Sequence, residues 1–583
     1  MAFDGYRIDE PIDRRVVFKS LLRRWIVNPR FALAVFGILS LAYMSVPGLY
    51  MDAVNPDYLA FVPSKPGGFI PAWLYPDNIL FPDFRHPLLA SLYGGATPGY
   101  IAMVFFGIFG HGLASLRLLH ICYGLAILSL VYLLLRSSTG RLGLAVVAIL
   151  ILGTDPSFIF AWRTQYYLQI FPLLFFIPAL FLLSRTLIQQ RDESKVMWGR
   201  FLLAGFLAGF SAWSYFIYAF YTGAILAVLV FLLWSRRTVM WKAALCFLLG
   251  AALGESPFIY AHLSIPLQVG IAGYIEDLRY LQSGYGVLNG QADTIFQRFS
   301  HVLDLWFSVS GGLPLERVMY GEEMSRMMDA DFLARRTPNY GPWVIAAFLG
   351  VIAVLAAALK FSSAARARVL QSPKGRRSVY LLIMIVAVMI AHFIFGMVMG
   401  RPLKYQHYAM LLILMDIGAF TALAIILSIC SPVWRIRWPL AGICGFVILV
   451  NVVHTYGIYE HLQKTGGRAE YTDVINRVGE YVQELPQDAI VAFPQWGYWM
   501  GALIIAGADR EVWEATTVDA LIKRINESPF RHRNFYILVS ANDPTALDRI
   551  AAATGLTLTG TRVFSDRAAV PQAIVGSFKG GPN

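Results

Sequence analysis

Long apolar runs constrain this chain more than any other feature. Eleven such runs, most of them long enough to cross about 30 Å of hydrocarbon as a helix, lie near residues 31–49, 114–135, 141–154, 165–184, 200–214, 216–234, 240–260, 341–360, 379–399, 408–430 and 438–456. A helix is the one single-segment structure that satisfies its own backbone hydrogen bonds inside a bilayer. Since 57% of the residues are hydrophobic and 14% are charged, we expect a mainly α, polytopic helical membrane protein of about 11 spans.

The basic residues orient these spans. If the N-terminus is cytoplasmic, the inner segments are rich in arginine and lysine, whereas the short outer turns hold only Arg163, Arg401 and Lys404. This asymmetry follows the positive-inside rule. We therefore expect a cytoplasmic N-terminus and, from the parity of eleven spans, a C-terminal tail on the outer face.

Charge and cysteine usage narrow the setting further. The net charge of +12 belongs mostly to residues that flank spans, where they face membrane lipid, and this argues against a nucleic-acid partner. The four cysteines lie within or at the ends of spans, so the outer segments contain no disulfide framework. The lack of outer disulfides fits a bacterial inner membrane that faces a periplasm.

Two long loops are expected on the outer face. The first, about 50–113, includes a short apolar stretch at Tyr100–Phe109 that we expect to lie on the membrane surface. The second, about 261–340, has patterns typical of one or two amphipathic helices, which suit a lid.

The C-terminal tail has a different pattern from the rest of the chain. Helical and strand patterns alternate in it, which is typical of an α/β domain. The expected helices are at Tyr471–Leu485, Leu521–Asn526 and Pro544–Ala553, and the expected strands are at Ala489–Phe493, Phe535–Val539 and Thr557–Phe564. We predict a membrane domain at 1–460 and a periplasmic α/β domain at 461–583.

Acidic residues stand at the outer ends of two neighbouring spans. Asp52 directly follows the first span, with Asp57 five residues on, and Asp155 follows the third. Carboxylates so placed can activate a hydroxyl nucleophile, or hold a divalent cation that in turn holds a phosphate. The alternatives are a solvated acidic cap for Asp52 and a turn residue before proline for Asp155. We predict Asp52 and Asp155 as catalytic residues, with either no cofactor or a divalent cation that these two would bind.

A cationic group precedes the tenth span. Arg401 and Lys404 stand beside Tyr405 and His407, and Arg163 is the remaining cation of the short outer turns. Two fixed cations at headgroup depth suit a lipid phosphate or pyrophosphate. The alternative is a set of interfacial anchors in an aromatic belt.

Other ionisable residues are candidates for function. His86 lies in the first loop, and Glu255 lies about one turn from the outer end of the seventh span. Asp416 and His392 lie inside spans, where ionisable groups indicate function by default. Pairing between helices is the alternative for Asp416, and a hydrogen-bonded core position is the alternative for His392.

Several of these residues carry a resemblance to a known family. The layout resembles the GT-C superfamily of membrane glycosyltransferases, which have a long first outer loop that opens with an acidic motif. Asp52 is similar in place to the catalytic acid of the lipid A aminoarabinose transferase and protein mannosyltransferase families, although Asp52-Ala53 stands where they show Asp-Glu. Arg85-His86-Pro87-Leu88-Leu89 resembles their His-Pro-Pro-Leu segment, and Lys404-Tyr405 resembles the Arg-Tyr that meets the lipid phosphate.

The resemblance implies a function. It implies an integral-membrane glycosyltransferase that moves a sugar from a polyprenyl-phosphate donor to a glycan or lipid acceptor at the periplasmic face. Asp52 would act as general base, and Arg401, Lys404 and Arg163 would stabilise the departing phosphate. Two alternatives come from other classes. A transporter or flippase would use Glu255 and the intramembrane residues and would show inverted repeats, and a non-catalytic envelope assembly protein would use the tail for docking.

Overall fold

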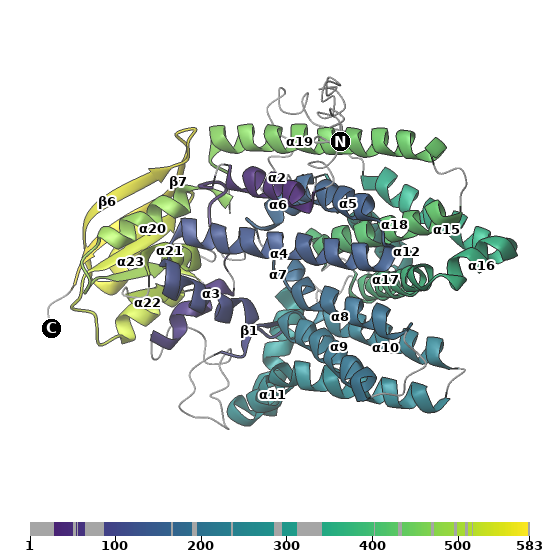
Figure 1. The fold of residues 1–583 in the computed structure, drawn as a ribbon. Helices are drawn as coiled ribbons and strands as arrows, with labels where there is room; N and C mark the ends of the chain where they lie inside the picture. Colours follow the sequence, from purple (N-terminus) through teal and green to yellow (C-terminus); the bar gives the residue numbers. More distant parts are fainter. Residues whose placement is uncertain are drawn as a thin grey trace, which may run out of the picture.

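The structure is a computed structural model, and it describes residues 28–42, 44–49, 54, 56–64, 87–164, 167–188, 195–234, 237–284, 294–311, 341–400, 403–429, 434–467, 471–494, 498–507, 511–515 and 517–580. It has a helical bundle and, at one end of this bundle, a smaller α/β part built from the C-terminal residues (Figure 1). This confirms the predicted class, a mainly α membrane protein with a C-terminal α/β region.

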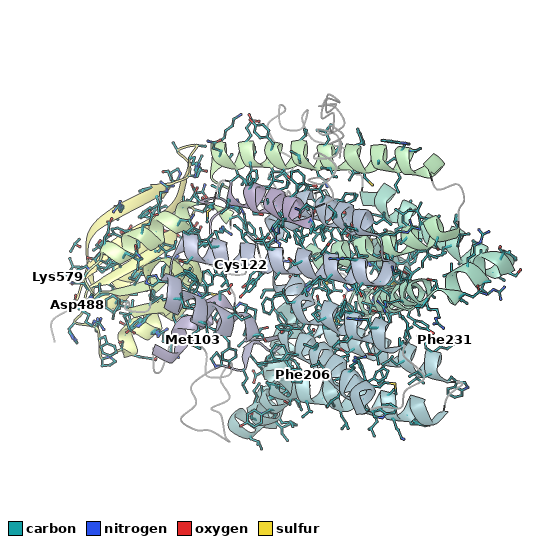
Figure 2. All side chains as sticks on the ribbon, in the orientation of Figure 1. Met103, Cys122, Phe206, Phe231, Asp488 and Lys579 are labelled. Carbon is teal, nitrogen blue, oxygen red and sulfur yellow. The ribbon has the colours of Figure 1, made fainter. Side chains whose placement is uncertain are left out.

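Each predicted apolar run contains a helix. These helices are α2 (Pro29–Leu41), α4 (Leu113–Thr139), α5 (Leu142–Thr154), α8 (Leu173–Thr186), α9 (Lys195–Ser214), α10 (Ile217–Leu233), α11 (Arg237–Gly284), α15 (Gly341–Phe361), α17 (Pro373–Met399), α18 (Ala409–Ile429) and α19 (Trp434–Thr465). Large apolar side chains project from the outer helices, among them Phe206 and Phe231 (Figure 2). In a bilayer these side chains contact lipid, so their exposure stabilises the inserted protein.

The helices are not all long enough to span a membrane. Within the described ranges, six helices are long and apolar enough to cross, or seven if α15 and α16 (Ser363–Gln371), which are bent by 103°, form one span. Helices α2 and α5 have 13 residues each, or about 20 Å at 1.5 Å per residue. The expected count of about 11 spans is therefore only approximate.

Small residues allow two helices of the bundle to pack closely. A Cβ atom added to Gly205 in α9 would lie 2.0 Å from the carbonyl oxygen of Phe247 in α11, and one added to Gly250 in α11 would lie 2.0 Å from that of Leu202. Larger residues would separate the backbones. This is the small-residue packing common between helices in lipid.

The two loops expected on the outer face both contain helices. In the first loop, the 3₁₀ helix η2 (Asp57–Ser64) is followed by the short strands β1 (Leu89–Ser91) and β2 (Gly94–Gly95) and by α3 (Thr97–Phe109). The apolar stretch at Tyr100–Phe109 lies within α3, and its position on the membrane surface stays a prediction. In the second loop, α11 continues past a break at Gly270 (φ 79°). There α12 (Ile295–Phe307) begins with a Thr294–Gln297 capping box.

The C-terminal part is a mixed five-stranded sheet with helices on both faces. Its strand order is β4-β3-β5-β7-β6, in which β3 is parallel to β4 and β5, and β7 is antiparallel to β5 and β6. Its elements are α20 (Val474–Glu484), β3 (Ile490–Phe493), α21 (Tyr498–Ala506), β4 (Glu511–Glu514), α22 (Val518–Glu527), β5 (Phe535–Ser540), α23 (Ala546–Thr554), β6 (Thr557–Ser565) and β7 (Pro571–Lys579). The strands and helices predicted in this tail are confirmed, and β4, β7 and α21 are additions.

The sheet joins two hydrophobic cores because strand residues alternate between its faces. Ile490 and Ala492 pack with α22 and α23. Val491 and Phe493 belong instead to the large core shared with the membrane helices. The helix α19 continues to Thr465, so residue 461 lies inside a helix. The division at this residue into two domains remains a prediction.

Candidate active site

The connection between α2 and η2 leads to Asp52, and arginine side chains hold its backbone. Arg163 is buried and donates to the carbonyl oxygens of Val46 (3.0 Å), Ala42 (2.7 Å) and Ser40. Arg117, in α4, donates to the Pro47 carbonyl at 2.6 Å. A continuing helix would use these carbonyls for its own hydrogen bonds. The arginines bind them instead, which agrees with the end of α2 at Leu41; the predicted apolar run continued to residue 49. Asp52 itself lies outside the described residues.

The C-terminal part holds the other side of this connection. The Asn476 amide donates to the Ser45 carbonyl at 2.9 Å and accepts from the Leu49 N–H at 3.2 Å. The Gly48 N–H donates to the Tyr471 carbonyl at 2.8 Å. The backbone of residues 45–49 is therefore bonded both to the membrane helices and to the C-terminal part.

Asp57 lies in a buried hydrogen-bond network. Its Oδ2 accepts from the Tyr167 hydroxyl at 2.6 Å and lies 2.9 Å from His120 Nε2, while His120 Nδ1 lies 3.0 Å from the Trp162 carbonyl oxygen. A carbonyl oxygen only accepts, so Nδ1 carries a proton. With Nδ1 protonated, the Nε2–Oδ2 contact is a hydrogen bond only when Nε2 or the carboxyl group carries a second proton. Asp57, which follows Asp52 by five residues, thus contacts α4 through His120 and α7 (Tyr167–Ile170) through Tyr167.

Asp155 has a local role and a long-range one. It is the N-cap of α6 (Pro156–Ala161), where its carboxylate accepts from the Ser157 N–H at 2.8 Å. It also accepts from the Ser310 hydroxyl at 3.1 Å and from the Gly311 N–H at 3.3 Å, just after α12. Burial raises the pKa of Asp155, and these hydrogen bonds act in the opposite direction. The turn interpretation thus describes its local role, and its catalytic role remains a prediction.

The structure separates the residues predicted at the lipid phosphate. Lys404 is exposed at the start of η4 (Tyr405–Tyr408), whereas His407 is buried and its Nδ1 lies 2.6 Å from the Tyr215 hydroxyl. Tyr405 is half-buried, with its hydroxyl 3.5 Å from Asp304 of α12. Arg401 lies outside the described residues. Of this group, Lys404 is therefore placed to meet a ligand from outside.

Of the remaining candidates, Glu255 and His392 lie in helices of the bundle. Glu255 is half-buried in α11, and His86 lies outside the described residues. His392 is buried with its Nδ1 2.6 Å from the Tyr221 hydroxyl, as its hydrogen-bonded core interpretation predicts. In the parts of the chain that the structure describes, no three His, Cys, Asp or Glu residues are grouped to hold a metal ion. A divalent cation bound by Asp52 and Asp155 therefore remains a prediction.

Sequence reasoning missed several residues that hold the site. His120 is an ionisable residue in a span, and this signal could have singled it out. Tyr167 and Asn476 carry no comparable signal, because their importance comes from partners 110 and 427 residues away.

Comparisons with known proteins agree with this architecture. The sequence profile of the dolichyl-phosphate-mannose-protein mannosyltransferase family matches residues 95–260. The crystal structure of ArnT from Cupriavidus metallidurans, bound to undecaprenyl phosphate, aligns over 98% of this chain and 100% of that chain, with a TM-score of 0.51 and 13% identity. No match to a curated protein reaches significance.

A second solved structure is similar at a lower level. Archaeal oligosaccharyltransferase AglB from Archaeoglobus fulgidus, in complex with an inhibitory peptide and a dolichol-phosphate, aligns over 90% of this chain and 71% of that chain, with a TM-score of 0.47 and 14% identity. The chain has the membrane fold of the GT-C glycosyltransferases, as its sequence resemblance predicts. Its likeness to ArnT extends over nearly the whole chain.

Proposed function

We propose that this protein is an integral-membrane glycosyltransferase that moves a sugar from a polyprenyl-phosphate donor to a glycan or lipid acceptor. The reaction would take place at the periplasmic face of a bacterial inner membrane. One observation supports this most strongly: in a GT-C fold, the connection that leads to Asp52 is anchored at Ser45–Leu49 before it and at Asp57 after it. A catalytic group on a loop needs such support to keep its geometry.

The proposed roles follow the chemistry of glycosyl transfer. Asp52 accepts the proton of an acceptor hydroxyl while that oxygen attacks the anomeric carbon of the donor sugar. The bond from this carbon to the phosphate oxygen breaks, and negative charge develops on the departing polyprenyl phosphate. Lys404, with Arg401 beside it, stabilises this charge. Tyr405 orients the same turn through its contact with Asp304.

Arg163 takes a positioning role in this proposal. The sequence suggested it for the lipid phosphate, but its guanidinium donates to backbone carbonyls of residues 40–46. With Arg117, it holds the segment that precedes Asp52 in the chain. In this proposal, Asp155 belongs to the same face. Its carboxylate accepts hydrogen bonds from Ser310 and Gly311, just after α12.

The test measures sugar transfer by Asp52→Asn in lipid nanodiscs. Donors are polyprenyl phosphates that carry a hexose or a pentose, acceptors are a membrane lipid and glycan extract, and release of polyprenyl phosphate is followed by mass spectrometry. We expect the parent protein to consume a donor and the variant to lose roughly 10²–10⁴-fold in rate, the usual contribution of a positioned base.

A matched control is Asp543→Asn, which removes a carboxylate from an exposed pair with Arg549 in the C-terminal part. It should keep the parental rate. A parental rate in Asp52→Asn would show that Asp52 is not the base. Donor transport across the membrane by the parent in sealed proteoliposomes, without release of polyprenyl phosphate, would instead support the transporter class.

A further inference from the structure

We propose that Asn476, in the C-terminal part, is a positioning residue for the transfer reaction, because its amide fixes the turn at Ser45–Leu49, three residues before Asp52 in the chain. The C-terminal part would then be a structural component of the active site. This inference rests on the proposed function, since it concerns how the same acid is placed.

The Asn476 side chain closes the turn at both of its ends. Its amide nitrogen donates to the Ser45 carbonyl at 2.9 Å, and its amide oxygen accepts from the Leu49 N–H at 3.2 Å. The side chain is buried, so water does not replace either bond at low cost. A short side chain that both donates and accepts is needed, and an aspartate or an alanine at this position would lose one or both bonds.

Backbone contacts bring the same two segments close together. Besides the hydrogen bond from Gly48 to Tyr471 (2.8 Å), a Cβ atom added to Gly48 would lie 1.9 Å from the Thr472 carbonyl oxygen. A Cβ atom added to Gly501 in α21 would lie 2.1 Å from the Leu49 carbonyl oxygen. Residues 48 and 49 therefore touch the C-terminal backbone directly, at a distance that only glycine permits.

The segment that follows Asp52 contacts the C-terminal part as well. The Tyr58 ring packs edge-on against Trp499 of α21, with ring centroids 5.3 Å apart. Asp57, next to Tyr58, is held by His120 and Tyr167. The described residues on both sides of 50–53 are thus in contact with C-terminal side chains.

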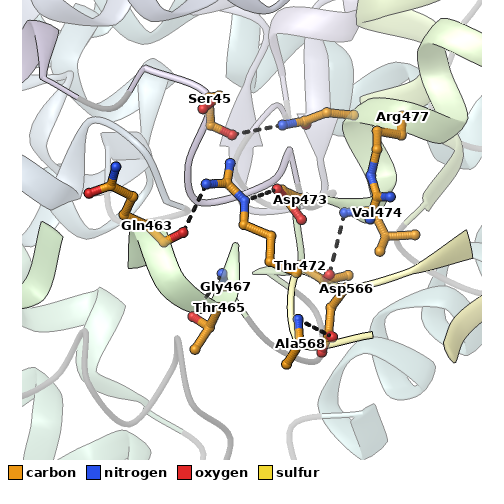
Figure 3. Close-up of polar contacts among 12 residues, drawn as sticks. Ser45, Gln463, Thr465, Gly467, Thr472, Asp473, Val474, Arg477, Asp566 and Ala568 are labelled. Carbon is orange, nitrogen blue, oxygen red and sulfur yellow. Dashed lines mark hydrogen bonds and ion pairs between the residues drawn. The ribbon is translucent and has the colours of Figure 1, made fainter. Parts of the chain in front are cut away.

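The hairpin between β6 and β7 fastens the start of α20. Arg567 donates to the Asp473 carboxylate at 2.7 Å and to the Gln463 carbonyl at 3.0 Å. The Asp566 carboxylate accepts from the Ala568 N–H at 2.9 Å, which shapes the hairpin turn (Figure 3). Asn476 is therefore attached to the sheet and to the end of α19, so its amide has a rigid support.

The test compares Asn476→Ala and Asn476→Asp with the parent in nanodiscs. Aspartate has nearly the same shape and keeps the acceptor for Leu49, but it cannot donate to Ser45. We expect kcat to fall tenfold or more in both variants, while the affinity for undecaprenyl phosphate stays within twofold. We also expect the acid limb of the pH profile of kcat/KM, which reports the general base, to shift in both. A purely structural role would leave this limb unchanged.

The matched control is Asn526→Ala, which removes an exposed asparagine whose amide donates to the Ala553 carbonyl within the same C-terminal part. It should match the parent in kcat and in pH profile. If Asn476→Ala does not fold, the near-isosteric Asn476→Asp decides. A folded Asn476→Asp with parental kcat and pH profile would overturn the inference. The proposed function would stand in that case if Asp52→Asn is still inactive, so the two failures are distinguishable.

Discussion

At the scale of single residues, two buried arginines, Arg163 and Arg117, show that the contacts of a side chain decide its role. An arginine near the outer face of a membrane protein can anchor at headgroups, bind a phosphate or hold backbone carbonyls. Arg163 and Arg117 do the last of these, because their guanidinium groups donate to carbonyls of residues 40–47. Planar guanidinium, with five N–H donors, can serve several carbonyls at once, whereas a lysine ammonium cannot do so in the same geometry.

The first prediction concerns Arg163→Lys. We expect it to lower the melting temperature and kcat together, since one ammonium cannot reach the Ser40, Ala42 and Val46 carbonyls and leaves a buried acceptor unsatisfied, at a cost of about 1–3 kcal/mol. Affinity for undecaprenyl phosphate should stay at the parental value. Thermal unfolding and lipid binding of the purified protein measure both. Weaker lipid binding with an unchanged melting temperature would show that Arg163 binds the lipid phosphate, as the sequence suggested.

At the scale of elements, α12 connects the two predicted groups. Its C-terminal end binds Asp155 through Ser310 and Gly311. Earlier in the helix, His301 Nε2 lies 3.0 Å from the Leu403 carbonyl oxygen, one residue before Lys404. The second outer loop therefore touches both the acid at the end of α5 and the cationic turn above α18.

The second prediction concerns this turn. Arg401→Ala and Lys404→Ala should each weaken binding of undecaprenyl phosphate by roughly 1–3 kcal/mol, the scale of a lost charge-assisted hydrogen bond. The exposed Lys523→Ala in α22 is the control for a general loss of positive charge. Binding is measured in detergent at fixed salt, because screening weakens such contacts. Unchanged affinity in the double variant would mean that both residues are interfacial anchors.

The third prediction concerns β4 and pH. Burial raises the pKa of Glu514 above its usual 4.5, while a hydrogen bond with Trp499 and the charge of Arg524 act in the opposite direction. A raised carboxyl pKa stabilises the folded state fully below pH 4.5, and this contribution is lost as pH rises through the folded pKa. Glutamine does not ionise. The melting temperature of Glu514→Gln minus that of the parent should therefore increase between about pH 4 and 7, and a constant difference would contradict this.

Elements differ in how far the sequence predicts them. The membrane helices follow from local composition, because lipid requires an apolar helix wherever the chain crosses. The β3 and β5 strands are apolar runs, which are readily found. The β4 strand has four residues with glutamate at both ends, and β7 includes a proline and a glycine, so neither shows a strand pattern. The α21 helix is apolar on every side, which hides the helical period.

The candidate site was predictable only in part. Carboxylates and cations at the ends of spans are visible in the chain, and Asp57, Asp155 and Lys404 were found in this way. Their partners were not, because distant elements supply them: His120 in α4 for Asp57 and Ser310 just after α12 for Asp155. Asn476 in α20, which bonds the turn at Ser45–Leu49, was missed for the same reason. Contacts over hundreds of residues depend on how the whole chain packs, and no local pattern encodes them.

At the scale of the whole molecule, the contacts of Asn476 constrain the topology. Leu49 and Asn476 are hydrogen-bonded, so residues 49 and 476 lie on the same side of the membrane. The chain between them must therefore cross the bilayer an even number of times. Ten apolar runs follow residue 49, and ten single crossings satisfy this condition. If one of the ten runs did not cross, the number of crossings would be odd and the condition would not be met.

The fourth prediction follows from this parity together with the basic residues of the inner segments. If the N-terminus is cytoplasmic, alkaline phosphatase fused after residue 583 should be active in a bacterial cell, and a fluorescent protein fused there should stay dark. Fusions after residue 190, between α8 and α9, should give the opposite result, and they serve as the matched control. The reciprocal pair of reporters excludes poor expression as the cause of either signal.

A fluorescent C-terminal fusion would place the C-terminal part, and with it the turn at Ser45–Leu49, in the cytoplasm. The acceptor would then have to be a cytoplasmic one, and the periplasmic site would be overturned while the contact between the two segments would still hold.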